Sequence, residues 1–321
     1  MKPDLRNSLA GLLAFLLMSI APSADAAKLL TFSTSGLGGN WAVIGAGIAK
    51  LLTDKMGGVI VKPEITGGAV DNNRLIQDGE TDIAMTVERI TYLGTLGQGP
   101  FAKKKITKAR MLLSGFEIGN HQLVTMASSG IRSIPGLKGR RVSAGPSGGG
   151  ATPAFAASLA AHGMTFKDMK TVFLNYDQTV TALVDGNLDA GLIYSALNIP
   201  VLKELQASGK KFNLISIDED KIKQISKSAP GYIRIVIPKE VYGLDKDTVT
   251  IGARNGLIVA SKLANETVYQ IIKIIDQNLE EVRKIHPSLK FMKRGEIATA
   301  SVPIPYHPGA VRYYKEAGLL K

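Results

Sequence analysis

The chain has 321 residues, a formal net charge of +12 at pH 7 and no cysteine. Because 45% of its residues are hydrophobic, it can bury one large core or two smaller ones. The lack of cysteine excludes disulfides, thiol catalysis and thiolate metal sites. The basic residues are scattered apart from short clusters at 103–105 and 138–141, and no aromatic residues alternate with them. We therefore expect no binding to nucleic acid.

The first 26 residues predict a cleaved secretory signal peptide. Basic Lys2 and Arg6 precede a mostly apolar run over 9–20, and residues 24–26 have the small-x-small form of a cleavage site. The apolar run is too short for the roughly 20 residues that a membrane-spanning helix needs. We therefore expect a periplasmic protein whose mature chain begins near Ala27.

Apolar runs alternate with helix-like stretches, which predicts mainly parallel sheets flanked by helices. The first predicted set has strands 29–34, 59–66 and 83–87 with helices 41–55 and 70–77, and the second has strands 141–144, 171–174 and 190–194 with helices 153–162 and 176–184. The segments 78–82 and 185–189 both read Asp-Gly-x-x-Asp after a predicted helix. The chain therefore uses one α/β module twice.

The apolar segments between and after these two sets predict the links between two lobes. Strands at 111–116 and 122–127 would cross from the first lobe to the second, strands at 232–237 and 256–260 would return, and a helix over 265–285 would close the first lobe. We expect an α/β fold of two lobes joined by crossover strands. The predicted boundaries are 27–122 with 240–321 for the first lobe and 123–239 for the second.

Three turns rich in glycine, hydroxyl and amide residues each follow a predicted strand and open into a helix. They cover residues 34–40, 66–72 and 145–152. Glycine lets the backbone approach a ligand closely, and a helix N-terminus offers N–H groups and positive dipole charge to an anion. Because ligands bind beyond the carboxyl ends of strands in such sheets, we expect one shared pocket. The candidate ligand-binding residues are Thr34, Gly38, Gly39, Asn40, Thr66, Gly67, Gly68, Asn72, Ser147, Gly148 and Thr152.

Four more side chains are expected at the same edge of the sheets. Trp41 would either form a wall of the pocket or pack under its helix. Tyr194 and Asn198 would add polar contacts or cap the next helix. Glu88 follows a buried strand and would either bind a ligand amine at the pocket rim or act as a general base.

The same turns partly match three other motifs, those of dinucleotide binding, of a P-loop and of a serine nucleophile. The dinucleotide-binding pattern starting at Gly36 has Trp41 at its third glycine position, and residues 145–152 lack the lysine of a P-loop. Residues 145–149 match Gly-x-Ser-x-Gly, so an exported enzyme with Ser147 as nucleophile, or Glu88 or His307 as base, stays an alternative. The four histidines are not in metal-ligand spacing. We expect no catalytic residues, no metal and no cofactor.

Five segments resemble the TAXI family of solute receptors of TRAP transporters, which are two-lobed periplasmic binding proteins of type II. They are residues 38–41 (Gly-Gly-Asn-Trp), 66–72, 137–146, 185–190 and the tail 307–318, and the tail is the most specific.

This resemblance covers most of the mature chain. It implies a protein that captures a small carboxylate or amino acid, such as glutamate or another organic acid, between its lobes and delivers it to a TRAP permease in the inner membrane. We expect the receptor to be a monomer. A ligand-binding sensor component would use the same pocket and stays open. Glu88 stands where the family often has a neutral polar residue, so the ligand's charge is left unassigned.

Overall fold

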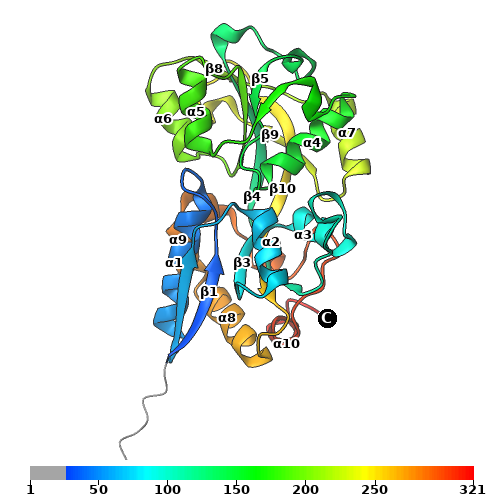
Figure 1. Ribbon diagram of the computed structural model, residues 1–321. Coiled ribbons are helices and arrows are strands. Elements are labelled where there is room, and N and C mark those ends of the chain that lie inside the picture. The colour runs from blue at the N-terminus through cyan, green and yellow to red at the C-terminus, as the bar shows by residue number, and fades with distance from the viewer. Residues whose placement is uncertain (1–26) are drawn as a thin grey trace, which may run out of the picture.

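The computed structural model describes residues 27–321, so the predicted signal peptide lies outside the described residues. These residues form a ten-stranded mixed sheet that runs through two lobes (Figure 1). Two long antiparallel strands, β4 (Ala109–Met126) and β10 (Thr248–Ala260), pair with each other and pass from one lobe to the other. Every helix in the described part is too short or too polar to cross a membrane.

The first lobe contains the strands nearest both ends of the described chain. Strand β1 (Lys28–Ser33) pairs in parallel with β2 (Val59–Glu64) and β3 (Ile83–Val87), and β3 pairs with β10 in the antiparallel sense. Its helices are α1 (Asn40–Lys55), α2 (Ala69–Asp78), α3 (Glu88–Leu96), α8 (Asn265–Gln277), α9 (Leu279–Ile285) and α10 (Pro308–Glu316). Helix α1 packs against α8 and α9, so the C-terminal segment returns to the first lobe.

The second lobe repeats this parallel arrangement on the other side of β4. Strand β5 (Arg141–Ser143) pairs in parallel with β6 (Lys170–Val172) and β7 (Ala190–Ser195), and β7 pairs with β4. The short strands β8 (Phe212–Leu214) and β9 (Ile233–Ile237) add to β4 and β10. The helices here are α4 (Ala151–Ala161), α5 (Tyr176–Val184), α6 (Pro200–Ala207) and α7 (Glu219–Ser228).

The two-lobed α/β fold is confirmed, and several predicted elements need correction. The predicted strands at 111–116 and 122–127 are one strand, because the polar residues between them are buried within β4. The predicted helix over 265–285 is divided at Asn278 into α8 and α9. Elements α3, α6, α7, α10 and β8 were not predicted. The lobe boundaries stay a prediction: the first, after residue 122, lies within β4, and the second, after residue 239, lies before β10.

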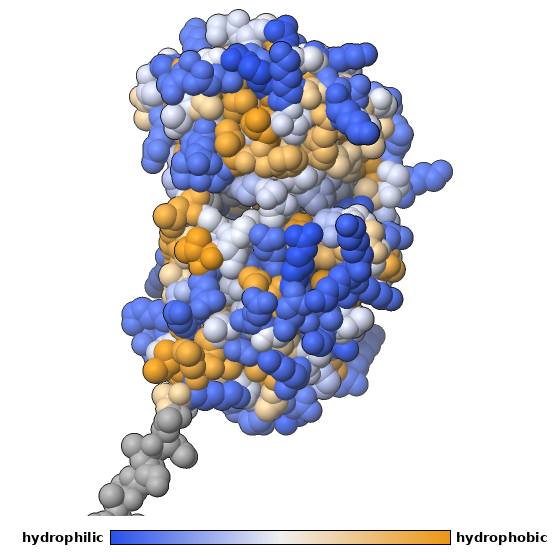
Figure 2. Space-filling model, in the orientation of Figure 1, coloured by the Kyte–Doolittle hydropathy of each residue, from blue (hydrophilic) through white to orange (hydrophobic). Residues whose placement is uncertain are grey.

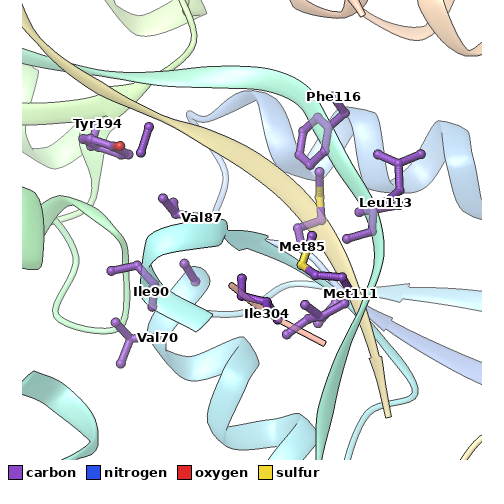
Figure 3. Packing of buried hydrophobic residues seen from close by; sticks show 14 of the residues in the cluster. Val70, Met85, Val87, Ile90, Met111, Leu113, Phe116, Tyr194 and Ile304 are labelled. Carbon is purple, nitrogen blue, oxygen red and sulfur yellow. The ribbon is translucent and has the colours of Figure 1, made fainter. Parts of the chain in front are cut away.

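The core is continuous beneath the site where the lobes meet. Met85, Met111 and Leu113 from β3 and β4 pack together, with Phe116 further along β4 (Figure 3). A separate cluster around Ile193, Leu202 and Tyr242 lies within the second lobe, whose helix α4 belongs to the continuous core. Apolar burial on both sides of β4 holds the crossover strands in a fixed register.

Asn72 of α2 joins the carboxyl ends of two first-lobe strands. Its side chain is fully buried and its Nδ2 donates to the carbonyl oxygens of Thr34 (2.8 Å) and Met85 (2.7 Å). Its Oδ1 accepts from the Thr66 hydroxyl at 2.6 Å. One side chain thus fixes two of the glycine-rich turns relative to β3.

We expect Asn72→Ala to lower the free energy of unfolding by about 2 kcal/mol, because the buried carbonyls of Thr34 and Met85 each lose a donor and the Thr66 hydroxyl loses an acceptor. Urea denaturation measures the change. Asn187→Ala, at an exposed turn position, is the control and should change stability by less than about 0.5 kcal/mol. Equal effects of the two substitutions would contradict this role of Asn72.

Candidate functional site

A cavity of about 60 Å³ lies between the lobes, at the carboxyl ends of the parallel strands. In Figure 2 a pale band of intermediate hydropathy crosses the molecule between its two halves. The cavity is lined from the first lobe by Ser35, Gly36, Leu37, Gly39, Asn40, Trp41, Gly67, Gly68, Ala69 and Val87, from the second by Pro146, Gly149, Gly150, Asn175, Tyr176, Tyr194 and Ser195, and from β10 by Asn255. Both lobes and a crossover strand therefore contribute to one cavity.

Six of the predicted site residues line this cavity. They are Gly39, Asn40, Trp41, Gly67, Gly68 and Tyr194. Sequence reasoning missed Asn175 and Ser195, although Asn175 precedes a predicted helix and Ser195 follows Tyr194. It also missed Asn255, which no local pattern marks because it lies inside a long strand.

The other predicted residues of the first lobe build the turns and do not line the cavity. The Thr66 hydroxyl donates to the Thr34 carbonyl at 3.1 Å and to Asn72, and the Thr34 hydroxyl donates to the Glu64 carbonyl at 2.9 Å. Gly38 has φ of +84°, and a Cβ there would lie 2.5 Å from the Asp177 carboxylate of the second lobe. These residues therefore hold the backbone of the turns in place without lining the cavity.

The second-lobe predictions divide in the same way. The Thr152 hydroxyl donates to the Pro146 carbonyl at 3.2 Å, and Asn198 adopts a left-handed turn with φ of 59°. Ser147 and Gly148 are outside the lining, beside Gly149. These residues therefore shape the turns beside the cavity: Thr152, Asn198, Ser147 and Gly148.

The structure does not place Glu88 at the pocket rim, and this prediction needs correction. Its side chain is fully buried at the start of α3. One carboxylate oxygen accepts from the Ser114 hydroxyl (2.5 Å) and the Gly115 N–H (3.2 Å), and the other accepts from the N–H (2.6 Å) and hydroxyl (2.7 Å) of Ser301. Arg254 Nε lies 3.8 Å away. Glu88 therefore joins α3, β4, β10 and the C-terminal segment.

The lobes meet through backbone contacts between glycines. The Gly148 carbonyl accepts from the N–H groups of Val70 (2.9 Å) and Asp71 (3.1 Å) in the first turn of α2. A Cβ on Gly68 would lie 3.3 Å from the Gly149 Cα, and Gly68 also has φ of +108°. Glycine is required at this contact because side chains would separate the two turns.

Five helices begin at residues that line the cavity, and their N-termini are satisfied differently. Helix α3 follows the lining residue Val87 and carries the Glu88 carboxylate in its own first turn. The first turn of α2 is occupied by the Gly148 carbonyl, and that of α5 is capped by the side chain of Asn175, which accepts from the Gln178 N–H at 2.8 Å. Helices α1 and α4 begin after Gly39 and Gly150, and no side chain caps either one. The N–H groups of α1 and α4 are the ones suited to an anionic ligand group.

Aromatic side chains complete the walls, and one buried acid lies behind them. The Tyr176 hydroxyl donates to the Tyr194 carbonyl at 2.7 Å, which fixes two aromatic walls against each other. Trp41 Nε1 donates to Glu117 Oε1 at 2.7 Å, and Asn255 Nδ2 donates to the same oxygen at 3.0 Å. Burial raises the pKa of Glu117 above its ordinary value, while the hydrogen bonds to its carboxylate act in the opposite direction.

We expect Glu88→Gln to lower the free energy of unfolding by about 2 kcal/mol, because an amide nitrogen would face hydrogen-bond donors in place of an acceptor oxygen. Chemical denaturation measures this change. Glu80→Gln, at an exposed position, should leave stability unaltered. A stable Glu88→Gln protein would show that these four hydrogen bonds contribute little.

We expect Gly149→Leu to keep the fold and to favour an open arrangement of the lobes, because an ideal Cβ at this position lies 3.4 Å from the Gly67 carbonyl of the first lobe and a leucine side chain would crowd that contact. Small-angle X-ray scattering should show a larger radius of gyration than for the unaltered protein. Gly57→Leu is the matched control, since a Cβ at Gly57 meets no atom within 4 Å. Identical scattering curves for the two variants would contradict the glycine contact.

Comparison with known proteins agrees with this architecture. A putative L-cystine ABC transporter protein from Listeria monocytogenes is 13% identical with a TM-score of 0.53, over 83% of this chain and 99% of that one. PhnD1 from Prochlorococcus marinus, solved in complex with methylphosphonate, is 12% identical with a TM-score of 0.52, over 91% of this chain and 99% of that one. At such identities the likeness shows the fold alone, that of a two-lobed periplasmic binding protein. The sequence pattern of the NMT1-like family matches residues 32–318, and the chain belongs to that family.

Proposed function

We propose that this protein is a periplasmic solute-binding receptor that captures a small carboxylate or amino acid between its lobes. The observation that carries this proposal is the cavity walled by both lobes, with the uncapped first turns of α1 and α4 at its edge. A carboxylate at these turns would accept hydrogen bonds from N–H groups of both lobes at once. Ligand binding would then stabilise the closed arrangement, since an open form offers only half of the contacts.

We further propose delivery to a TRAP-type permease of the inner membrane, with the receptor acting as a monomer exported by its signal peptide. The resemblance of five segments to TAXI receptors supports this partner. The Listeria neighbour carries the name of an ABC transporter, so a permease of that class is the competing partner. Co-purification with a membrane permease distinguishes the two transporter classes, and binding to a membrane kinase would instead indicate a sensor.

A non-catalytic role fits the positions of the histidines. His307 Nδ1 accepts from the Gly309 N–H at 3.2 Å and so caps α10. His121 is fully buried against Ser158 at 3.1 Å, and burial lowers its pKa to about 4. Within residues 27–321 neither histidine forms a hydrogen bond with Ser147. In the exported-enzyme alternative, neither of these two histidines is therefore the base for Ser147.

We expect a member of a panel of small carboxylates and amino acids to raise the thermal midpoint of the protein, since a ligand that binds only the folded state stabilises it by mass action. Differential scanning fluorimetry measures the shift. Gly149→Leu should reduce it and Gly57→Leu should not. If phosphate esters or nucleotides raise the midpoint and no carboxylate does, the proposed ligand class is wrong.

Mass spectrometry of the ligand after incubation tests the non-catalytic role in the same samples. We expect complete recovery of the unchanged ligand. Conversion to a product would favour the exported enzyme.

A further inference from the structure

Two buried glutamates lie on or beside the crossover strands, and their surroundings differ sharply. Glu88 accepts four hydrogen bonds, two on each oxygen, and has Arg254 beside it. Glu117 of β4, 5% exposed, accepts two hydrogen bonds, both on Oε1. Its Oε2 is buried with no hydrogen-bond partner among residues 27–321. Both carboxylate oxygens of Glu88 are therefore hydrogen-bonded, whereas one carboxylate oxygen of Glu117 is not.

The charge of Glu117 is also uncompensated by the described part of the chain. Burial raises the pKa of its carboxyl group, hydrogen bonds from neighbouring side chains lower it, and no lysine, arginine or histidine of residues 27–321 contributes to the shift. Asn40 and the Ser288 hydroxyl also lie beside the carboxylate, and Ser288 is already hydrogen-bonded to His286 Nδ1 at 2.9 Å. A buried carboxylate without a cation is costly, so a positive partner would stabilise it strongly.

Glu117 also determines which atoms its neighbours present to the cavity. By accepting from Asn255 Nδ2, it holds that amide with Oδ1 free, and Oδ1 has no hydrogen-bond partner in the described chain. Asn40, 1% exposed like Asn255, lacks partners for both amide atoms. Both asparagines line the cavity. The unpaired groups of these asparagines are thus two acceptor oxygens and the Asn40 amide nitrogen, and the oxygens are complementary to N–H donors.

Trp41 reinforces the same preference. Its indole N–H is engaged by Glu117, and the residue lines the cavity beside Asn40. An indole ring attracts a cation placed over its face. Two free amide oxygens and an aromatic ring therefore line the cavity, and the Glu117 carboxylate lies directly behind them, hydrogen-bonded to Trp41 and Asn255.

We propose that Glu117, Asn40, Asn255 and Trp41 form a subsite for a positively charged N–H group of the ligand, an ammonium or amidinium. The amide oxygens of Asn40 and Asn255 accept its hydrogen bonds, and Glu117 neutralises its charge and positions Asn255. This proposal rests on the receptor function proposed above and narrows its ligands to those that carry a cationic nitrogen. The acid that compensates the charge of a ligand amine is thus Glu117, behind the lining residues Asn255 and Trp41, in place of Glu88.

The test compares pairs of ligands that differ by one amino group. Titration calorimetry measures the affinity of the full mature protein for glycine and acetate, L-alanine and propionate, and L-glutamate and glutarate. We expect the amino member of at least one pair to bind at least about tenfold more tightly than its partner acid. Glu117→Gln should weaken binding of that amino compound at least about tenfold and change binding of the matching acid less than about twofold.

The same substitution at the two buried glutamates supplies a control for folding. Glu117→Gln should leave the thermal midpoint of the ligand-free protein unchanged or raise it, because it removes an uncompensated buried charge. Glu88→Gln should lower that midpoint, because it disrupts a completed set of hydrogen bonds.

Three results separate the possible failures. Acids that bind as tightly as their amino partners would overturn the cationic subsite and leave the receptor function standing. Unaltered affinity of Glu117→Gln for the amino compound would do the same. If no member of any pair binds, the carboxylate receptor is wrong, and the subsite that rests on it is wrong as well.

Discussion

The close approach of two glycine turns is the constraint on which the rest of the site depends. Gly67 and Gly68 of the first lobe meet Gly148 and Gly149 of the second at backbone distance, and the Gly148 carbonyl occupies the first turn of α2. Without side chains at these positions, the lobes close until Tyr194 and Trp41 become walls of a single cavity. The contact between the turns and the completed cavity therefore occur together in this arrangement, in which β4 and β10 are shared by both lobes.

Because of this contact, the helix N-termini at the cavity differ in their hydrogen-bond partners. The N–H groups of α2 hold the second lobe, so they are engaged within the protein when the lobes are closed. The first turns of α1 and α4, one from each lobe, have no side-chain cap. A repeated strand–turn–helix motif thus serves closure in one copy and offers N–H groups to a ligand in two others.

The sequence predicts the α/β modules well, because strands and helices leave local periodic patterns and glycine marks the turns. It predicts the turn residues Gly39, Asn40 and Gly68, since the carboxyl ends of parallel strands face one site. It cannot locate Glu117 or Asn255, which come together only through the register of β4 with β10, a pairing between segments far apart in the chain. Glu88 was misplaced for a related reason, since its partner Ser301 is 213 residues away.

The register of the crossover strands has a further consequence for recognition. Glu117 of β4 lies directly opposite Asn255 of β10, at the level where both strands pass between the lobes. A group that binds this pair therefore contacts the part of the fold that the lobes share, while the glycine turns move with their own lobes. The shared strands β4 and β10 would select the charge of a ligand. The glycine turns and walls of the two lobes would contact its remaining atoms. Open and closed forms would then share the same charge preference, and closure would add the discrimination of ligand size and shape.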